Sequence, residues 1–169
     1  MYLRKFDLLG ICMMICGSCT PVYYYGFSCP GFEFYQAFYI AQVWIFCFVA
    51  LYVSLRPSQK DFKKTWVLAT AWIIAGYSTA PGLIHIAYYL DPKYLYAVDF
   101  NAYAIGGSIY AGGAVLYALK FPERFFKGYF DKLGNSHNIF HVCCLIGAIW
   151  HWRASFSMFH ERQLFVCPI

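Results

Sequence analysis

The sequence predicts an all-α integral membrane protein, a helical bundle in which residues 1–169 form a single domain with five transmembrane helices. Of the 169 residues, 61% are hydrophobic and only 12% are charged, whereas soluble domains average about 45–50% apolar and about 25% charged residues. The apolar residues also fall into five separate stretches, each close to the roughly 20 residues that a helix needs to cross a bilayer. These observations exclude a disordered chain and argue against a soluble domain.

The five predicted spans cover residues 7–27, 34–55, 66–89, 97–119 and 137–159. Turn-forming residues occupy each interval between them, because proline and glycine interrupt regular structure. These turns are Pro30-Gly31, Arg56-Pro57, Asp91-Pro92 and Phe121-Pro122. A further pair, Pro81-Gly82, falls inside the third span and predicts a break within it.

The distribution of lysine and arginine predicts the orientation of the chain. Two lie before the first span, four between the second and third spans, and four between the fourth and fifth, whereas the opposite side has only three. Positive residues favour the cytoplasmic side, so we expect a cytoplasmic N-terminus and a C-terminus outside. This asymmetry accounts for the net charge of +5 without a basic patch of the kind that binds nucleic acid.

Six of the eight cysteines lie inside the apolar stretches, where a thiol behaves as a small hydrophobic group. Cys29 and Cys167 lie near the ends of spans instead. Cys12, Cys16 and Cys19 have a spacing that can hold an iron–sulfur cluster, but their surroundings are helical and apolar. We therefore interpret these three thiols as core residues.

Small residues recur at four-residue spacing along the fourth span, at Ala104, Ser108 and Gly112, with Gly107 and Ala111 beside them. Such a stripe lets two membrane helices approach closely, and we expect a helix–helix contact there. The alternative is a flexible or substrate-facing helix.

His137 and His141, at the start of the fifth span, are candidate metal ligands. Their spacing places both imidazoles on one face of a helix, about 6 Å apart along its axis, where they can share one zinc ion. The alternative is a pair of interfacial histidines bonded to their neighbours. Asn135 and Ser136 are predicted to cap this helix.

Asp7 begins the first span on the same predicted side and at about the same depth as this histidine pair. A carboxylate beside a histidine-bound metal can orient or deprotonate a metal-bound water. Alternatively, Asp7 is an acid in a first helical turn, favoured by the helix dipole or by Arg4 or Lys5. His85 and His151 lie further along their helices and are interpreted as polar contacts between helices.

The stretch from Pro122 to Val142 resembles the progestin and adipoQ receptor family, which includes the adiponectin receptors and haemolysin-III-like proteins. The family signature is P-E-R-[FY]-F-P-G, followed by S-H-x-[IL]-[FW]-H at the start of the last helix. This chain has PERFFKG at 122–128, with Lys127 in place of the usual proline, and SHNIFH at 136–141. Residues 3–11 resemble the opening of the family's third helix and residues 79–85 its fifth, so the resemblance covers essentially the whole chain.

The resemblance implies seven transmembrane helices, of which this chain would supply the last five and lack the first two. It also implies a zinc site with three histidines, in which His137 and His141 match the two from the last helix and Asp7 matches the acid associated with zinc-bound water. The histidine of the second helix has no counterpart here. We expect either an incomplete sequence or a shortened, inactive relative. The first is favoured because a bundle without two helices would expose Asp7 to lipid.

Two functions follow from the resemblance. The first is a receptor-like zinc hydrolase of a lipid amide such as ceramide, in which His137 and His141 hold zinc and Asp7 positions or deprotonates its water. The second is a non-enzymatic receptor or scaffold with zinc structural or absent. Expected partners are the lipid bilayer, a lipid substrate or product in the bundle and an extracellular ligand, but no nucleic acid. Plasma membrane, Golgi and endoplasmic reticulum all fit.

Overall fold

The computed structural model describes residues 2–55, 62–89, 99–130 and 132–167, and the secondary structure in these ranges is entirely helical. The helices are α1 (Tyr2–Gly26), α2 (Glu33–Leu55), α3 (Phe62–Tyr77), α4 (Ala80–Ile84), the π-helical turn η1 (His85–Tyr89), α5 (Phe100–Leu119) and α6 (Ser136–Leu164). Among these described residues, five stretches are long and apolar enough to cross a membrane, which confirms the predicted number of spans.

Some of the residues on which the predicted orientation and the predicted turns depend are not among the described residues. Arg56, Lys60 and Lys93 lie outside the described residues, as do the predicted turns at Arg56-Pro57 and Asp91-Pro92. The side chains of Arg4 and Lys5, the alternative partners of Asp7, are also outside the described part.

The third span is broken where Pro81 and Gly82 predict a break. α3 ends at Tyr77 and α4 begins at Ala80, so Pro81 lies in the first turn of a new helix, where its missing N–H costs no hydrogen bond. The hydroxyl groups of Ser78 and Thr79 donate to the carbonyl oxygens of Ala75 and Gly76. These bonds satisfy hydroxyl groups and carbonyl oxygens beside the break, which would otherwise lack hydrogen-bond partners in the bilayer.

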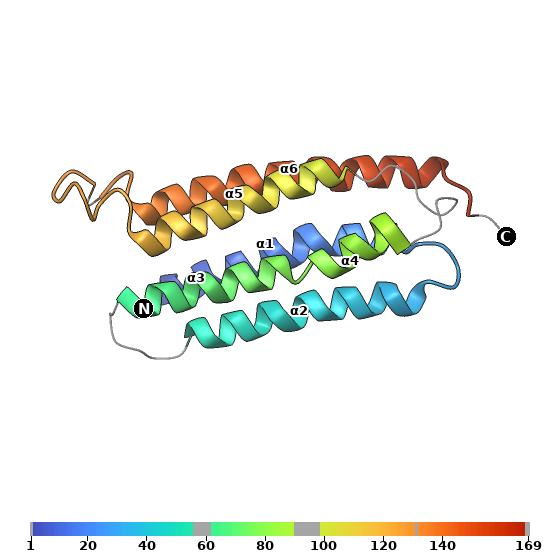
Figure 1. Cartoon of the computed structure of the whole chain (residues 1–169), viewed down its shortest axis with the longest axis horizontal. Coiled ribbons are helices and arrows are strands. Elements are labelled where there is room, and N and C mark those ends of the chain that lie inside the picture. Colours follow the sequence, from blue (N-terminus) through green and yellow to red (C-terminus); the bar gives the residue numbers. More distant parts are fainter. Residues whose placement is uncertain (1, 56–61, 90–98, 131, 168–169) are drawn as a thin grey trace.

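The helices form a closed ring in which α1 contacts α2, α2 contacts α3, α3 contacts α5, α5 contacts α6 and α6 returns to α1. In Figure 1, α5 and α6 lie above α1, α3 and α4, and α2 lies below them. The N-terminus and the α5–α6 connection lie at one end of the bundle, and the C-terminus lies at the other (Figure 1). The ring therefore places the starts of α1 and α6 at the same end.

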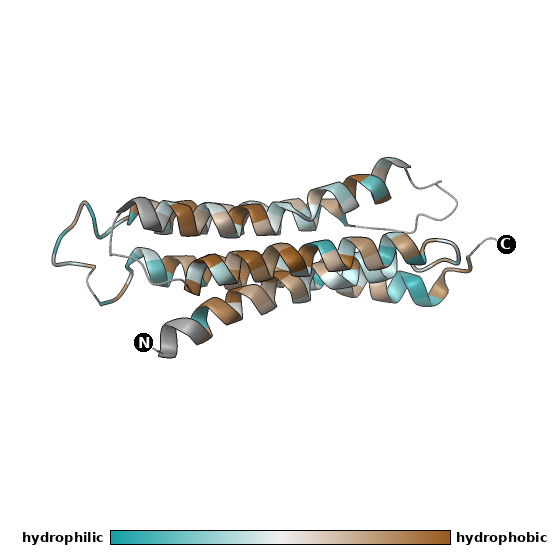
Figure 2. Ribbon diagram, turned by 90° about the horizontal axis from the view of Figure 1, so that it is seen from below, coloured by the Kyte–Doolittle hydropathy of each residue, from teal (hydrophilic) through white to brown (hydrophobic). Residues whose placement is uncertain are grey.

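The outer surface of the bundle is apolar, as the bilayer requires. Large side chains such as Phe48, Leu145 and Trp152 are more than half exposed. Figure 2 shows hydrophobic residues along the lengths of the helices, with the strongest hydrophilic colours toward their ends and in the loops. Such exposed apolar surface would be a liability in water, but in a membrane it faces lipid tails.

α5 and α6 make the most extensive helix contact, and glycines set their distance. A Cβ added to Gly106 would lie 2.9 Å from the carbonyl oxygen of Gly147 and would overlap the ring of His151. The glycines of the predicted stripe do not make this contact: a Cβ added to Gly107 or Gly112 would have no atom of another residue within 4 Å. The expectation that this stripe forms the helix contact is therefore wrong, because the contact uses the adjacent face of α5.

We expect Gly106→Ala to destabilise the bundle by about 1–3 kcal/mol, because the added methyl group overlaps a buried ring and a backbone oxygen that cannot move independently. Gly112→Ala is the matched control on the same helix. It should leave stability unchanged or raise it slightly, since alanine favours helix over glycine. Thermal unfolding in detergent measures both, and equal melting temperatures would contradict the close α5–α6 approach.

A disulfide joins Cys29, in the α1–α2 connection, to Cys167, in the C-terminal tail. The sequence placed both cysteines near span ends but did not indicate that they pair. Arg162 reinforces this junction, since its guanidinium donates to the hydroxyl of Ser28 and to the carbonyl oxygen of Phe165. The bond closes the end of the bundle opposite the N-terminus.

Candidate metal centre

Asp7, His137 and His141 lie together at the N-terminal end of the bundle, where α1 packs against α6. The Nε2 atom of His137 lies 3.2 Å from one carboxylate oxygen of Asp7, and that of His141 lies 3.2 Å from the other. The two Nε2 atoms are 3.1 Å apart. The predicted pair of imidazoles on one helix face is thus present, and α1 adds the carboxylate from 130 residues away in sequence.

The spacing of these atoms suits a zinc ion. Zinc–nitrogen and zinc–oxygen bonds of about 2.0–2.2 Å in a tetrahedral arrangement place neighbouring ligand atoms roughly 3.3–3.5 Å apart. The separations of 3.1–3.2 Å between the carboxylate and imidazole atoms come close to this. Two imidazoles and a carboxylate are also a donor set that zinc accepts. For both Nε2 atoms to serve as ligands, the ring protons must sit on Nδ1.

Both histidines remain accessible, with side chains 49% and 48% exposed, whereas Asp7 is 23% exposed. The ring of Tyr117 packs against His137 at 5.7 Å, and Phe140 packs against His141 at 5.9 Å. These neighbours limit the orientations of the two imidazoles while leaving their ligand atoms open. An ion and a reacting water can therefore reach the site.

Glu123 fixes the start of α6, which carries both histidines. Its carboxylate accepts hydrogen bonds from the backbone N–H of Ser136, at 2.7 Å, and from the Ser136 hydroxyl. Asn135 caps the same helix as predicted, since its side chain accepts from the N–H of Asn138. Burial opposes ionisation of Glu123, but the hydrogen bonds from Ser136, a bond from its own backbone N–H and the charge of Lys120 together outweigh it and hold the pKa of this carboxyl below its usual value. The sequence motif gave no structural role for Glu123.

We expect Glu123→Ala to cost about 1–2 kcal/mol of stability, the range for a lost helix cap, and to weaken zinc binding because His137 directly follows Ser136. The folded-state pKa of Glu123 is lowered, so its contribution is complete above the ordinary value of 4.5 and is lost as the pH falls below it. Melting temperatures at pH 7 and pH 4 check this. The variant should lose less stability than the natural chain between these pH values.

The candidate metal centre lines one of two spaces that adjoin each other inside the bundle. Beside Asp7 and the two histidines is a space of about 540 Å³, and a second space of about 280 Å³ lies further along α1, α3, α5 and α6. Four residues line both spaces: Ile11, Trp72, Ala114 and Phe140. The predicted small-residue stripe of α5, including Gly107 and Ser108, faces the second space, which supports the alternative of a ligand-facing helix.

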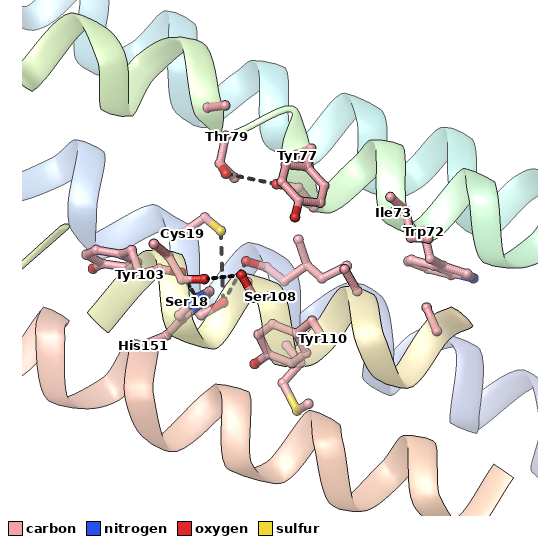
Figure 3. A pocket seen from close by; sticks show the side chains of 18 of the residues that line it. Ser18, Cys19, Trp72, Ile73, Tyr77, Thr79, Tyr103, Ser108, Tyr110 and His151 are labelled. Carbon is pink, nitrogen blue, oxygen red and sulfur yellow. Dashed lines mark hydrogen bonds between the residues drawn. The ribbon is translucent and has the colours of Figure 1, made fainter. Parts of the chain in front are cut away.

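The lining of the inner space is mainly apolar, with a few polar groups directed into it (Figure 3). The indole N–H of Trp72 and the Nδ1 atom of His151 are buried and have no hydrogen-bond partner among the described residues. Buried polar atoms are normally satisfied. Both atoms have almost no accessible surface, so neither is open to a ligand in this space.

The remaining histidines do not belong to the metal centre. His85 contacts the hydroxyl of Tyr39 on α2, and His151 contacts the carbonyl oxygen of Tyr103 on α5. Their interpretation as polar contacts between helices is confirmed. Cys12, Cys16 and Cys19 are core residues as predicted, with exposures of 5% or less. Cys47 of α2, which the sequence did not single out, joins Cys12 and Cys16.

Residues 1–152 match the sequence profile of the family described as Haemolysin-III related. The chain belongs to this family. Among the relatives of this haemolysin-III related chain are Heptahelical transmembrane protein 5 of Arabidopsis thaliana, 32% identical over 152 residues, and Progestin and adipoQ receptor-like protein 1 of Caenorhabditis elegans, 32% identical over 166 residues. The Adiponectin receptor protein of Drosophila melanogaster is 32% identical over 168 residues.

These matches cover 89%, 98% and 95% of the haemolysin-III related chain but only 40%, 38% and 36% of the three relatives. The chain thus spans about two fifths of the length of the relatives it matches. It is a multi-pass membrane protein of the family to which the adiponectin receptors and the progestin and adipoQ receptor-like proteins belong. The resemblance at residues 122–142 is therefore confirmed at the level of the family.

Proposed function

We propose that this chain carries the metal centre of a receptor-like membrane zinc hydrolase that cleaves a lipid amide of the ceramide type. One observation carries the proposal: ligand atoms of Asp7, His137 and His141 lie within 3.2 Å of one another, beside a space of about 540 Å³ that adjoins the inner space of the bundle. The proposed zinc site, the proposed catalytic role of Asp7 and the proposed lipid substrate all depend on this arrangement.

His137 and His141 would hold the zinc ion through their Nε2 atoms, and further ligand positions stay open for water or for another side chain. When bound, zinc supplies a Lewis acid that polarises a carbonyl group and makes water more acidic. In this arrangement Asp7 would not be a zinc ligand. Its carboxylate, 3.2 Å from each imidazole, would instead accept a proton from a water at one of the open positions. Addition of water to the amide carbonyl and cleavage of the carbon–nitrogen bond would yield a fatty acid and a long-chain amine.

The cavity supports a lipid as the substrate. Its apolar walls suit an acyl chain, and the hydroxyl groups of Ser18 and Ser108, which line it, can accept hydrogen bonds from polar atoms of the same molecule. Pockets with mostly apolar walls and few polar groups are typical of ligand sites. A lipid that enters from the bilayer could thus place its amide near the metal centre while its chain fills the inner space.

We also propose that the N-terminus and the metal centre face the cytoplasm. The excess of lysine and arginine at that end supports this orientation. The Cys29–Cys167 disulfide, at the opposite end, supports it independently, because disulfides persist in oxidising compartments and are rare in the cytosol. Labelling of a cysteine introduced at Lys132 with a membrane-impermeant maleimide tests it. Reaction only after permeabilisation of intact cells is expected, and reaction in intact cells would reverse the orientation.

The activity is tested with purified protein, a fluorescent ceramide and zinc, with release of the fatty acid as the readout. Asp7→Asn is expected to lower the rate by about 10²–10⁴-fold, the range for loss of a general base, while zinc binding through the two histidines persists. Glu161→Gln, at the other end of α6, is the matched control and should retain full activity. Equal rates for Asp7→Asn and the natural chain would contradict the catalytic role of Asp7.

The second candidate is a non-enzymatic receptor or scaffold. The presence of only two histidines in the candidate centre, among the described residues, favours it. In the same assay this function predicts zinc and lipid binding by the natural chain with no release of fatty acid.

A further inference from the structure

Three thiols meet in the core of the bundle, away from the candidate zinc centre. Cys12 and Cys16 lie one helical turn apart on the same face of α1, and Cys47 approaches from α2. All three side chains have an exposure of 0%, and their sulfur atoms lie within 4.8 Å of one another. Cys12 follows Asp7 by five residues, about 7.5 Å along the helix, and the thiols face α2 rather than α6.

We propose that Cys12, Cys16 and Cys47 form a binding site for a soft monovalent metal ion, Cu(I). Cysteine thiolate is the ligand type that selects soft ions such as Cu(I), and this group of described residues contains no imidazole or carboxylate. Metal–sulfur bonds of about 2.3 Å require neighbouring sulfur atoms roughly 3.8–4.0 Å apart. Small rotations of the three side chains from their present separation would reach that distance.

Coordination number favours Cu(I) over zinc at this site. Structural zinc sites are almost always tetrahedral with four ligands, whereas the structure groups only three sulfur atoms here among the described residues. Cysteine binds a metal ion as the thiolate, so loading with Cu(I) releases one proton for each thiol that becomes a ligand.

The neighbouring cysteines provide internal controls. Cys19, three residues after Cys16, lines the inner cavity instead and is not part of the group. Cys143 lies on α6, is half-buried and carries a free thiol. Cys29 and Cys167 form the disulfide and have no free thiol. The site therefore depends on three named thiols, and a fourth free thiol on another helix can be removed without touching it.

The test is anaerobic titration of the purified chain in detergent with a Cu(I)–acetonitrile complex, in competition with a chromophoric Cu(I) chelator. We expect one tightly held Cu(I) per chain, an affinity at least about 100-fold lower in Cys47→Ala, and an unchanged affinity in Cys143→Ala. The double variant His137→Ala and His141→Ala should also keep its Cu(I). Equal affinities for the natural chain and Cys47→Ala would overturn the proposal.

A measurement on the natural chain keeps the proposal testable if Cys47→Ala does not fold. Copper K-edge absorption of the loaded protein should show a first shell of sulfur atoms only. A shell containing nitrogen or oxygen would assign the copper to the histidine centre and contradict the proposal. Thiol titration in denaturant before loading should find all six free cysteines reduced. A lower count, with the missing thiols mapped to Cys12, Cys16 or Cys47 by mass spectrometry, would indicate a disulfide within the cluster and overturn the proposal.

Discussion

The double substitution His137→Ala and His141→Ala is expected to reduce zinc from one ion per chain to none. The two Nε2 atoms lie 3.1 Å apart and each is 3.2 Å from the Asp7 carboxylate, so the variant removes both nitrogen ligands and leaves one carboxylate. The loss of even an outer contact to a metal ligand typically costs 10–100-fold in affinity, and the loss of two ligands should cost more than about 100-fold. Elemental analysis after gel filtration, combined with competition against a zinc chelator, measures it.

The matched control is the double variant His85→Ala and His160→Ala. His85 contacts Tyr39 and His160 lies exposed at the far end of α6, so this variant loses the same number of imidazoles without touching the centre. It should retain full zinc binding. If both double variants lose zinc equally, the ion is bound non-specifically and the centre described here is wrong.

Removal of the Cys29–Cys167 disulfide is expected to give the largest change in stability. The bond links residues 138 apart in sequence, and a crosslink that closes a long loop typically contributes about 2–4 kcal/mol, largely by restricting the unfolded chain. The double variant Cys29→Ser and Cys167→Ser should therefore melt well below the natural chain. A reductant should lower the melting temperature of the natural chain toward the same value.

Two comparisons show whether the change in melting temperature is caused by loss of the disulfide. The melting temperature of the double serine variant should not respond to reductant, because no disulfide remains. Cys143→Ser, which removes a free thiol of α6, should melt like the natural chain. A natural chain whose melting temperature is unaffected by reductant would show that the bond does not stabilise the bundle.

Hydrophobicity and local motifs were sufficient to predict most of the fold. An apolar stretch of bilayer length has few alternatives to a transmembrane helix. Pro81 and Gly82 mark the break in the third span, because proline lacks a backbone N–H for the helical hydrogen bonds and glycine is a poor helix former. The asparagine cap of α6 and the shared helix face of His137 and His141 depend only on residues within one turn. Local rules suffice for such features, and the structure agrees with them.

Contacts between distant segments were not predictable in the same way. The disulfide, the bond from Ser136 to Glu123 and the approach of Cys47 to Cys12 each depend on which helices become neighbours. The prediction for the small-residue stripe of α5 was wrong for the same reason, because the sequence does not show which helix packs against which face. Spacing identified a face with small residues, but only the packing shows that Gly106 contacts α6 while Gly107 faces the cavity.

The central claim is that Asp7, His137 and His141 form one zinc centre, and zinc K-edge absorption spectroscopy of the loaded natural chain tests it most directly. Our account predicts one zinc ion with a first shell of nitrogen and oxygen atoms at about 2.0–2.2 Å, including the outer-shell scattering of two imidazoles. A shell dominated by sulfur at about 2.3 Å would instead place the ion on the cysteines. That result would contradict the account.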